Sequence, residues 1–254
     1  MTTILFYVLL TLGISSLFTM LGLGGGLVLS PFFILSGISL PLAVSTSLLI
    51  NGAATLSASV AYMQKKMIRF KVALPLLVGS VLGAPWGARL TADLNLRFVL
   101  AVLTLAMLFG AYRMAFSHPQ VDEDRSDRLG NLRIFAGGVG IGVGVGIVGA
   151  MVGIGGGIFM MPVLMLVMHV STRNAAAAST LLSAALSGSG FLTHLALGNY
   201  QLGFTLPMAA AGILGGQIGS RFMIRKISGR TIRRMFAALL LLMSIQLIYR
   251  IWIR

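Results

Sequence analysis

The first 64 residues of this chain contain no lysine, arginine, aspartate or glutamate. At about 1.5 Å per residue they could form roughly 96 Å of helix, enough for about three crossings of a hydrocarbon core about 30 Å thick. Of the 254 residues, 57% are hydrophobic and only 9% are charged, whereas a soluble domain has roughly 25% charged residues. The sequence therefore predicts a polytopic membrane protein. We interpret the N-terminal stretch as a first span, because it lacks the basic region and cleavage site of a signal peptide.

The apolar segments form two sets of five, separated by a polar stretch that holds four of the five acidic residues. We expect an all-α fold with a first transmembrane repeat at 1–116, a cytoplasmic linker at 117–133 and a second repeat at 134–254. Because each half has an odd number of segments, the second should be inverted relative to the first. The segments are approximately 4–21, 27–38, 43–63, 72–90 and 98–116, then 134–152, 158–170, 175–197, 203–222 and 235–251.

Four sequence features occur once in each half. Gly22-Leu23-Gly24-Gly25-Gly26 returns as Gly153-Ile154-Gly155-Gly156-Gly157, and each copy continues through an apolar run to a proline. A duplicated half with a glycine-broken segment in the corresponding place indicates a transporter's binding site. The other pairs are Pro31 with Pro162, Ser47-Leu48-Leu49 with Thr180-Leu181-Leu182, and Gly83-x-x-x-Gly87-x-Arg89 with Gly215-x-x-x-Gly219-x-Arg221.

Basic residues give an independent test of inversion. We assign the net charge of +14 to loops that fix the topology, and not to nucleic-acid binding. The loop at 64–71 is strongly basic while its counterpart at 198–203 is uncharged, and the bias reverses between 91–97 and 223–234. The positive-inside rule makes the two basic loops cytoplasmic, so corresponding loops lie on opposite sides. Both termini would then be outside, although basic residues near the C-terminus count against that orientation.

The segment after each glycine cluster is short. Residues 27–38 would form about 18 Å of helix, which falls short of the membrane core. The helix should therefore begin below the membrane surface, where irregular backbone persists only if it is buried in protein or lines a wet cavity. Two such breaks entering from opposite faces should meet near the midplane.

Each glycine cluster is a candidate anion cradle. A helix that begins at a glycine loop offers unpaired N–H groups and the positive end of its dipole, and glycine lets that backbone approach a ligand closely. The alternative, that the glycines only permit tight helix packing, remains open. We interpret the spacing Gly138-x-x-x-Gly142-x-x-x-Gly146 as packing alone.

The helix after each short segment carries a polar stripe. In the first half it comprises Thr46, Ser47, Asn51 and Thr55, and in the second Thr180, Ser183, Ser187 and His194. Membrane hydroxyls usually bond to backbone carbonyls or to a neighbouring helix, so that role stays open for each serine and threonine. Asn51 and His194 are the better candidates for lining a cavity, because burying them unpaired costs more. His194 could couple transport to protons, or could be a structural histidine bonded to a carbonyl.

The sequence lacks the residues that other transport mechanisms, catalysis or metal binding would need. No predicted span contains an aspartate or glutamate, which argues against a carboxylate proton relay, a carboxylate sodium site and a cationic substrate. Without cysteines, paired carboxylates or clustered histidines, no catalytic constellation or metal site can be assembled. We expect no enzyme activity, no cofactor and no metal, and the residues favour an anionic substrate.

The two sets of ordered motifs resemble the sulfite exporter TauE/SafE family of bacterial membrane permeases. The similarity covers nearly the whole chain outside the linker, and departs where Ser179-Thr180 inverts the order of Thr46-Ser47. It implies transport of a sulfur-containing oxyanion, such as sulfite, a sulfonate or a sulfoacetate-like carboxylate, across the inner membrane. The residues that carry the resemblance are 22–26, Pro31, 43–49 and 83–90, then 153–157, Pro162, 179–182 and 215–221.

The sequence thus predicts a secondary-active anion transporter that works by alternating access, with a passive anion channel and a non-transporting scaffold or subunit as alternatives. The expected partners are a small anion and the lipid bilayer, without nucleic acid, and a homodimer is compatible with the sequence. His194 is the candidate for proton coupling. The predicted substrate-binding residues are Gly24, Gly25, Gly26, Thr46, Ser47, Asn51, Gly155, Gly156, Gly157, Ser179 and Thr180.

Overall fold

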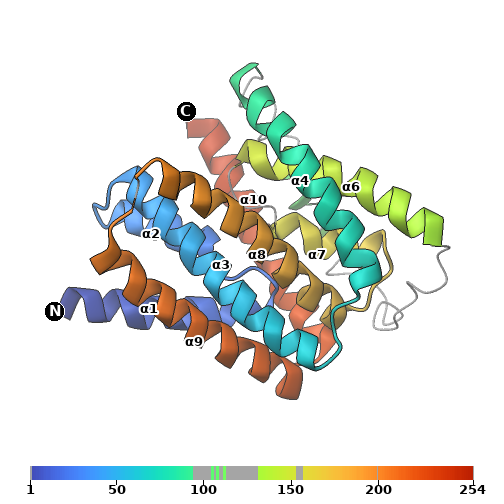
Figure 1. Cartoon of the computed structure of the whole chain (residues 1–254), viewed down its shortest axis with the longest axis horizontal. Coiled ribbons are helices and arrows are strands. Elements are labelled where there is room, and N and C mark those ends of the chain that lie inside the picture. The colour runs from blue at the N-terminus through green and yellow to red at the C-terminus, as the bar shows by residue number, and fades with distance from the viewer. Residues whose placement is uncertain are drawn as a thin grey trace.

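The computed structural model describes residues 2–93, 104–105, 107–108, 111–112, 131–152, 157–198 and 200–253, and this part of the chain is helical with short connections (Figure 1). The prediction of an all-α fold is confirmed there, and nine predicted segments correspond to nine helices. The predicted segment at 98–116 lies largely outside the described residues. The helices are α1 (Thr2–Met20), α2 (Gly26–Leu35), α3 (Leu40–Gln64), α4 (Phe70–Asp93), α6 (Asn131–Val152), α7 (Gly157–Leu166), α8 (Thr172–Ala196), α9 (Leu202–Lys226) and α10 (Gly229–Ile253).

Three helices in the described ranges are long and apolar enough to cross a membrane, namely Pro41–Gln64, Thr172–Ala196 and Leu202–Lys226. The two segments that follow the glycine clusters are short, as predicted. Helices α2 and α7 have 10 residues each, or about 15 Å of helix. Each therefore spans about half of a hydrocarbon core.

The centre of the fold is the antiparallel pair α3 and α8. Asn51 bonds to Ser187 over 2.6 Å and Ser59 to Thr180 over 3.1 Å, so residue numbers rise along one helix as they fall along the other. Helix α9 lies parallel to α3, because the hydroxyls of Thr46 and Thr205 are 3.2 Å apart and the Gly216 backbone lies against Ala54 further along.

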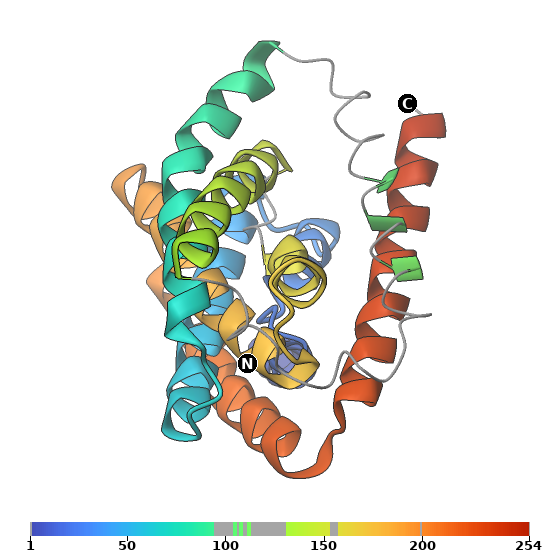
Figure 2. The same cartoon turned by 90° about the vertical axis from the view of Figure 1, so that its right-hand side faces the viewer.

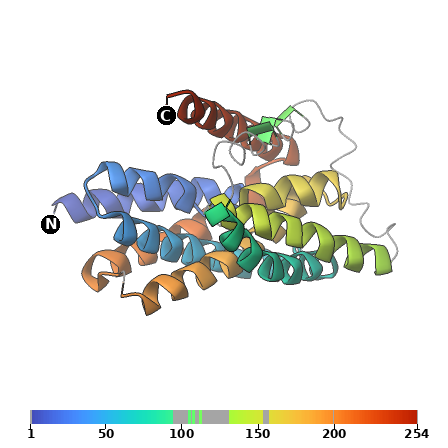
Figure 3. The same ribbon diagram turned by 90° about the horizontal axis from the view of Figure 1, so that it is seen from above.

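The first helix of each half packs against the fourth helix of the other half. Helix α1 lies parallel to α9 and α6 lies parallel to α4, and Figure 3 shows α1 and α6 running in opposite directions. Glycines allow these close contacts. A Cβ placed on Gly142 would lie 2.5 Å from Leu76 O, and one on Gly146 would lie 2.3 Å from Ser80 O. The packing role predicted for this glycine face is therefore confirmed.

Because α3 and α9 are parallel, the turns that follow them lie at one end of the protein, which we call the basic end. The uncharged turn between α8 and α9 lies at the opposite end. The predicted loop at 223–234 is wrong in extent, because α9 continues to Lys226 and α10 begins at Gly229. Basic residues end the apolar runs there without ending the helices. Two further boundaries also differ from the prediction, because α4 continues through the start of the predicted loop to Asp93, and 131–133 of the predicted linker belong to α6.

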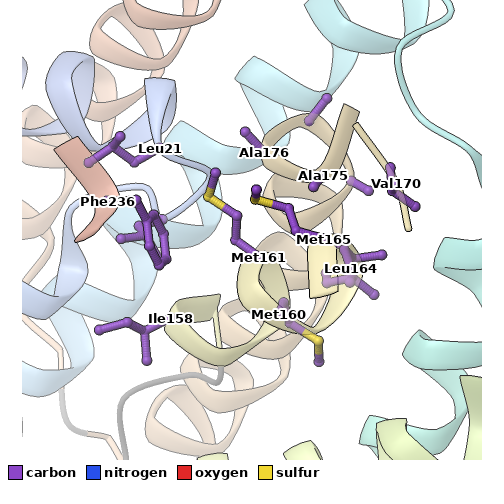
Figure 4. Packing of buried hydrophobic residues seen from close by; sticks show 14 of the residues in the cluster. Leu21, Ile158, Met160, Met161, Leu164, Met165, Val170, Ala175, Ala176 and Phe236 are labelled. Atoms are coloured by element: carbon purple, nitrogen blue, oxygen red, sulfur yellow. The ribbon is translucent and has the colours of Figure 1, made fainter. Parts of the chain in front are cut away.

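The main hydrophobic core is built around α7. Figure 2 shows α7 between α10 on one side and α4 with α6 on the other. Its Met161 and Met165 pack toward α8 at Ala176 and Ala175, and Phe236 of α10 closes the other side of the cluster (Figure 4). The unbranched methionine side chains can follow the flat, alanine-rich surface that α8 presents at this point.

Candidate functional site

The first glycine loop lies beside the middle of α3. Asn51 stands near the centre of this 25-residue helix, and the backbone of Gly24 is pressed against it. A Cβ on Gly24 would lie 2.4 Å from Thr55 Cγ2 and 2.6 Å from Asn51 Oδ1, and its φ of +78° also favours glycine. The break between α1 and α2 is thus placed about halfway along a helix long enough to span the membrane.

The N-terminal end of α2 is capped from α3. The Gly26 N–H donates to Asn51 Oδ1 over 3.0 Å, while the N–H groups of Val28 and Leu29 bond to Gly25 O over 3.1 Å. The described residues supply no hydrogen-bond acceptor to the N–H groups of Gly24 and Gly25. Asn51 Oδ1 therefore occupies the position on the helix dipole that an anion oxygen would take.

Asn51 also connects the two halves of the chain. Its Nδ2 donates to Ser187 Oγ on α8 over 2.6 Å, and the side chain is only 7% exposed. The Asn51 carboxamide thus connects the N-terminal end of α2 to α8 in the second half of the chain. The sequence made Asn51 a candidate for lining a cavity, because burying it unpaired is costly. In the structure it is buried and bonded to Gly26 and Ser187.

Helix α8 holds the other side of the loop. Ser179 Oγ donates to Gly22 O over 2.8 Å, and Ser183 Oγ lies 3.3 Å from the same oxygen. Thr180 Oγ1 donates to Ala177 O over 2.6 Å and accepts from Ser59. The hydroxyls of Ser179 and Thr180 are therefore engaged in backbone and interhelical bonds, which was the open alternative for each of them.

Ser47 is the predicted hydroxyl that has no partner. Its Oγ is buried without a hydrogen bond, on the same face of α3 as Asn51 and one turn before it. Thr46, by contrast, pairs with Thr205 of α9 over 3.2 Å. The structure thus brings Gly24, Gly26, Asn51 and Ser179 together, with Ser47 one turn away and Thr46 turned toward α9.

Sequence reasoning missed Ser15, whose Oγ is also buried without a partner. It lies on α1 next to the loop, because a Cβ on Gly25 would be 3.4 Å from Ser15 Cα. The signal that could have found it is the spacing of Thr11, Ser15 and Thr19, which places three hydroxyls on one face of an apolar helix.

His194 is not part of this cluster. It follows Ser187 by two turns of α8, or about 10 Å, and its Nδ1 is buried without a hydrogen-bond partner. Of the second predicted cradle, Gly155 and Gly156 lie outside the described residues. Gly157 is the first residue of α7, as predicted.

Comparisons with known proteins agree with this architecture. The family model for the sulfite exporter TauE/SafE matches residues 7–247. The probable membrane transporter protein YunE of Bacillus subtilis (strain 168) is 26% identical over 267 residues, covering 96% of this chain and 97% of the relative. A probable membrane transporter protein of Haemophilus influenzae is 24% identical over 229 residues, covering 89% of this chain and 87% of the relative. No solved structure matches.

Proposed function

Because the chain belongs to the sulfite exporter TauE/SafE family, we propose that this membrane transporter moves a small sulfur-containing anion, such as sulfite, a sulfonate or sulfoacetate, across the bacterial inner membrane. The proposed mechanism is secondary-active transport by alternating access. The family supports the substrate class, and the printed names of both relatives support membrane transport.

The contact between Gly26 and Asn51 is the observation that carries this proposal. Asn51 Oδ1, an acceptor oxygen, lies at the positive N-terminal end of α2. Asn51 itself stands near the middle of α3, which is long enough to cross the membrane. Among the described residues the only carboxylate is Asp93, at the end of α4, so this part of the chain brings no carboxylate to the loop. The local field therefore favours an anion over a cation.

The structure is closed around this site. Gly22, Gly24 and Gly25 are buried, and Asn51 occupies the Gly26 N–H. We interpret this as a closed arrangement of the loop against α3. An arriving anion would replace Asn51 Oδ1 on the Gly26 N–H, and Asn51 Nδ2 could then donate to the anion instead of to Ser187. The unpaired hydroxyl of Ser47 would supply a further donor.

Inverted repeats would provide the alternating access. Three observations support inversion. Helices α3 and α8, which correspond in the two halves, are antiparallel, α1 and α6 run in opposite directions, and the pairing of α1 with α9 is repeated by α6 with α4. Rocking of one repeat against the other would occur at the α3–α8 interface, with the basic end facing the cytoplasm. Gly155, Gly156 and Gly157 would complete the site from the second repeat.

Flux into proteoliposomes tests the proposal. We expect uptake of sulfite or sulfoacetate above the sulfate and acetate controls, and at least a tenfold loss for Asn51→Leu and for Gly25→Val. Ser36→Ala is the matched control, because Ser36 carries an exposed hydroxyl at the far end of α2. Unchanged flux in both site variants would reject these residues as the binding site.

The same assay separates the alternatives. A coupled carrier concentrates its substrate when a proton gradient is imposed, whereas a channel only equilibrates it and a scaffold moves none. His194→Gln, tested under the same gradient, should abolish concentration but leave equilibrating exchange if His194 couples protons.

A further inference from the structure

Arg233 is a largely buried cation, and two of its three guanidinium nitrogens lie buried without a hydrogen-bond partner. It stands on the second turn of α10 and is only 6% exposed. Its Nε and Nη1 are buried without a hydrogen-bond partner. Its neighbours Arg230 and Arg234 are exposed, so water can solvate them. Arg233 alone in this turn carries its charge into the protein interior.

The buried face of α10 leads toward the glycine loops. Arg233 shares this face with Phe236 and Leu240, which are both buried. Phe236 packs in one core cluster with Leu21 and Ile158 (Figure 4), which directly precede Gly22 and follow Gly157. Because α10 begins at the basic end, Arg233 lies one turn nearer to that end than Phe236. It therefore stands between the basic end and the segments that carry the loops.

Arg173 shows how a structural arginine is accommodated at the same end. Its Nη2 donates to the carbonyl oxygens of Met223 and Ile224, and so caps the C-terminal end of α9. Arg173 Nε is unpaired as Arg233 Nε is, but no carbonyl oxygen of the described residues accepts a hydrogen bond from the Arg233 guanidinium. A guanidinium cannot lose its proton, and a buried charge without a partner is strongly unfavourable. The only carboxylate among the described residues is Asp93, which ends α4 at the opposite end of the protein. The described residues therefore place no carboxylate near Arg233.

We propose that Arg233 binds an oxyanion in a second anion site, separate from the glycine loops. The planar guanidinium matches the oxygens of a phosphate, sulfite or sulfonate group. Basic side chains concentrate such anions at this end of the protein; they are Lys65, Lys66, Arg69, Lys71, Arg225, Lys226, Arg230 and Arg234. The anion could be a free ion or the phosphate of a lipid headgroup, and this inference does not rest on the proposed transport.

The test measures thermal stability of the full-length protein, stripped of lipid in dodecyl maltoside micelles, in Tris chloride without oxyanions. One arm titrates inorganic phosphate and sulfite, and the other adds phosphatidylglycerol to the micelles. Ligand that binds only the folded protein raises its melting temperature. The variants are Arg233→Gln and its matched control Arg234→Gln, which removes the same charge from an exposed position in the same turn. Arg233→Lys keeps the charge without the planar fork.

Oxyanion should stabilise the wild-type protein and Arg234→Gln, while Arg233→Gln binds about ten- to a hundredfold more weakly and Arg233→Lys is intermediate. Stabilisation by phosphate or sulfite identifies a free ion, and stabilisation by phosphatidylglycerol alone identifies a lipid. Without either, Arg233→Gln should melt at or above the wild-type temperature, because an unpaired buried charge is gone.

The inference is overturned if neither arm stabilises the wild-type protein, if Arg233→Gln responds as Arg234→Gln does, or if Arg233→Gln melts lower in the absence of anion. Asn51→Leu, measured in parallel, should retain the response that depends on Arg233. A protein that transports no anion but keeps this response would refute only the proposed function.

Discussion

Asn51 Nδ2 donates to Ser187 Oγ over 2.6 Å, and this bond joins α3 of the first half to α8 of the second at the level of the first glycine loop. The same carboxamide accepts from the Gly26 N–H. One side chain thus carries both the cap of a half-helix and a contact between the halves. Loop position and packing of the halves are therefore coupled through Asn51.

Replacing Asn51 should cost more stability than replacing Ser187. Asn51→Leu leaves the partly buried Gly26 N–H without an acceptor, which should cost about 1–3 kcal/mol. Ser187→Ala leaves one N–H of the Asn51 carboxamide without its acceptor but keeps the bond to Gly26, so it should cost about 1 kcal/mol, at the low end of the same range. Denaturation monitored by tryptophan fluorescence would measure both. An equal loss for the two variants would show that Asn51 does not cap α2.

Gly24→Ala tests how closely the loop approaches α3. Gly37 is a matched control, because both residues have positive φ, at +78° and +85°, but no atom lies within 4 Å of a Cβ at Gly37. Both variants should lose about 1–2 kcal/mol from backbone strain, and Gly24→Ala should lose about 1–3 kcal/mol more from the clash with Thr55. Thermal stability of the two purified proteins measures the difference, and equal losses would contradict the contact.

The two faces of α6 should respond oppositely to alanine. Gly142→Ala would place a Cβ 2.5 Å from Leu76 O, while no atom lies within 4 Å of a Cβ at Gly144. Gly142→Ala should lose about 1–3 kcal/mol, and Gly144→Ala should be neutral or gain up to about 1 kcal/mol. Yield of monodisperse protein and its melting temperature provide the readout. Similar effects at both positions would argue against the close packing of α4 and α6.

The orientation of the turns can be read by cysteine labelling, since the chain has no native cysteine. Lys66→Cys and Ser228→Cys lie at the basic end and should react with a membrane-impermeant maleimide only after the cytoplasmic side is opened. Tyr200→Cys lies in the uncharged turn and should react in intact cells. Labelling of residues 66 and 228 from different sides would contradict the parallel packing of α3 and α9.

Much of the fold could be predicted from hydrophobic runs, since each described helix matches an apolar segment. The first glycine break was expected to be buried in protein or to line a cavity, and it lies against Asn51 in the middle of α3. Helix ends were less predictable, because Arg225 and Arg230 end an apolar run without ending a helix. The spacing of hydroxyls on α1 could have marked Ser15 as part of a polar face, but neither its place beside Gly25 nor the burial of Arg233 could be predicted. Both depend on which helix lies opposite, and local periodicity does not specify that.

The pairing of α1 with α9 also determines when the chain can fold. Helix α6 can dock as soon as it leaves the ribosome, because α4 has already been made. Helix α1 must wait until residues 202–226 have been synthesised before its partner exists. During that interval the face of α1 that will pack against Gly215 and Gly219 of α9 lacks this partner. The contact between α1 and α9 can therefore form only in the last part of translation.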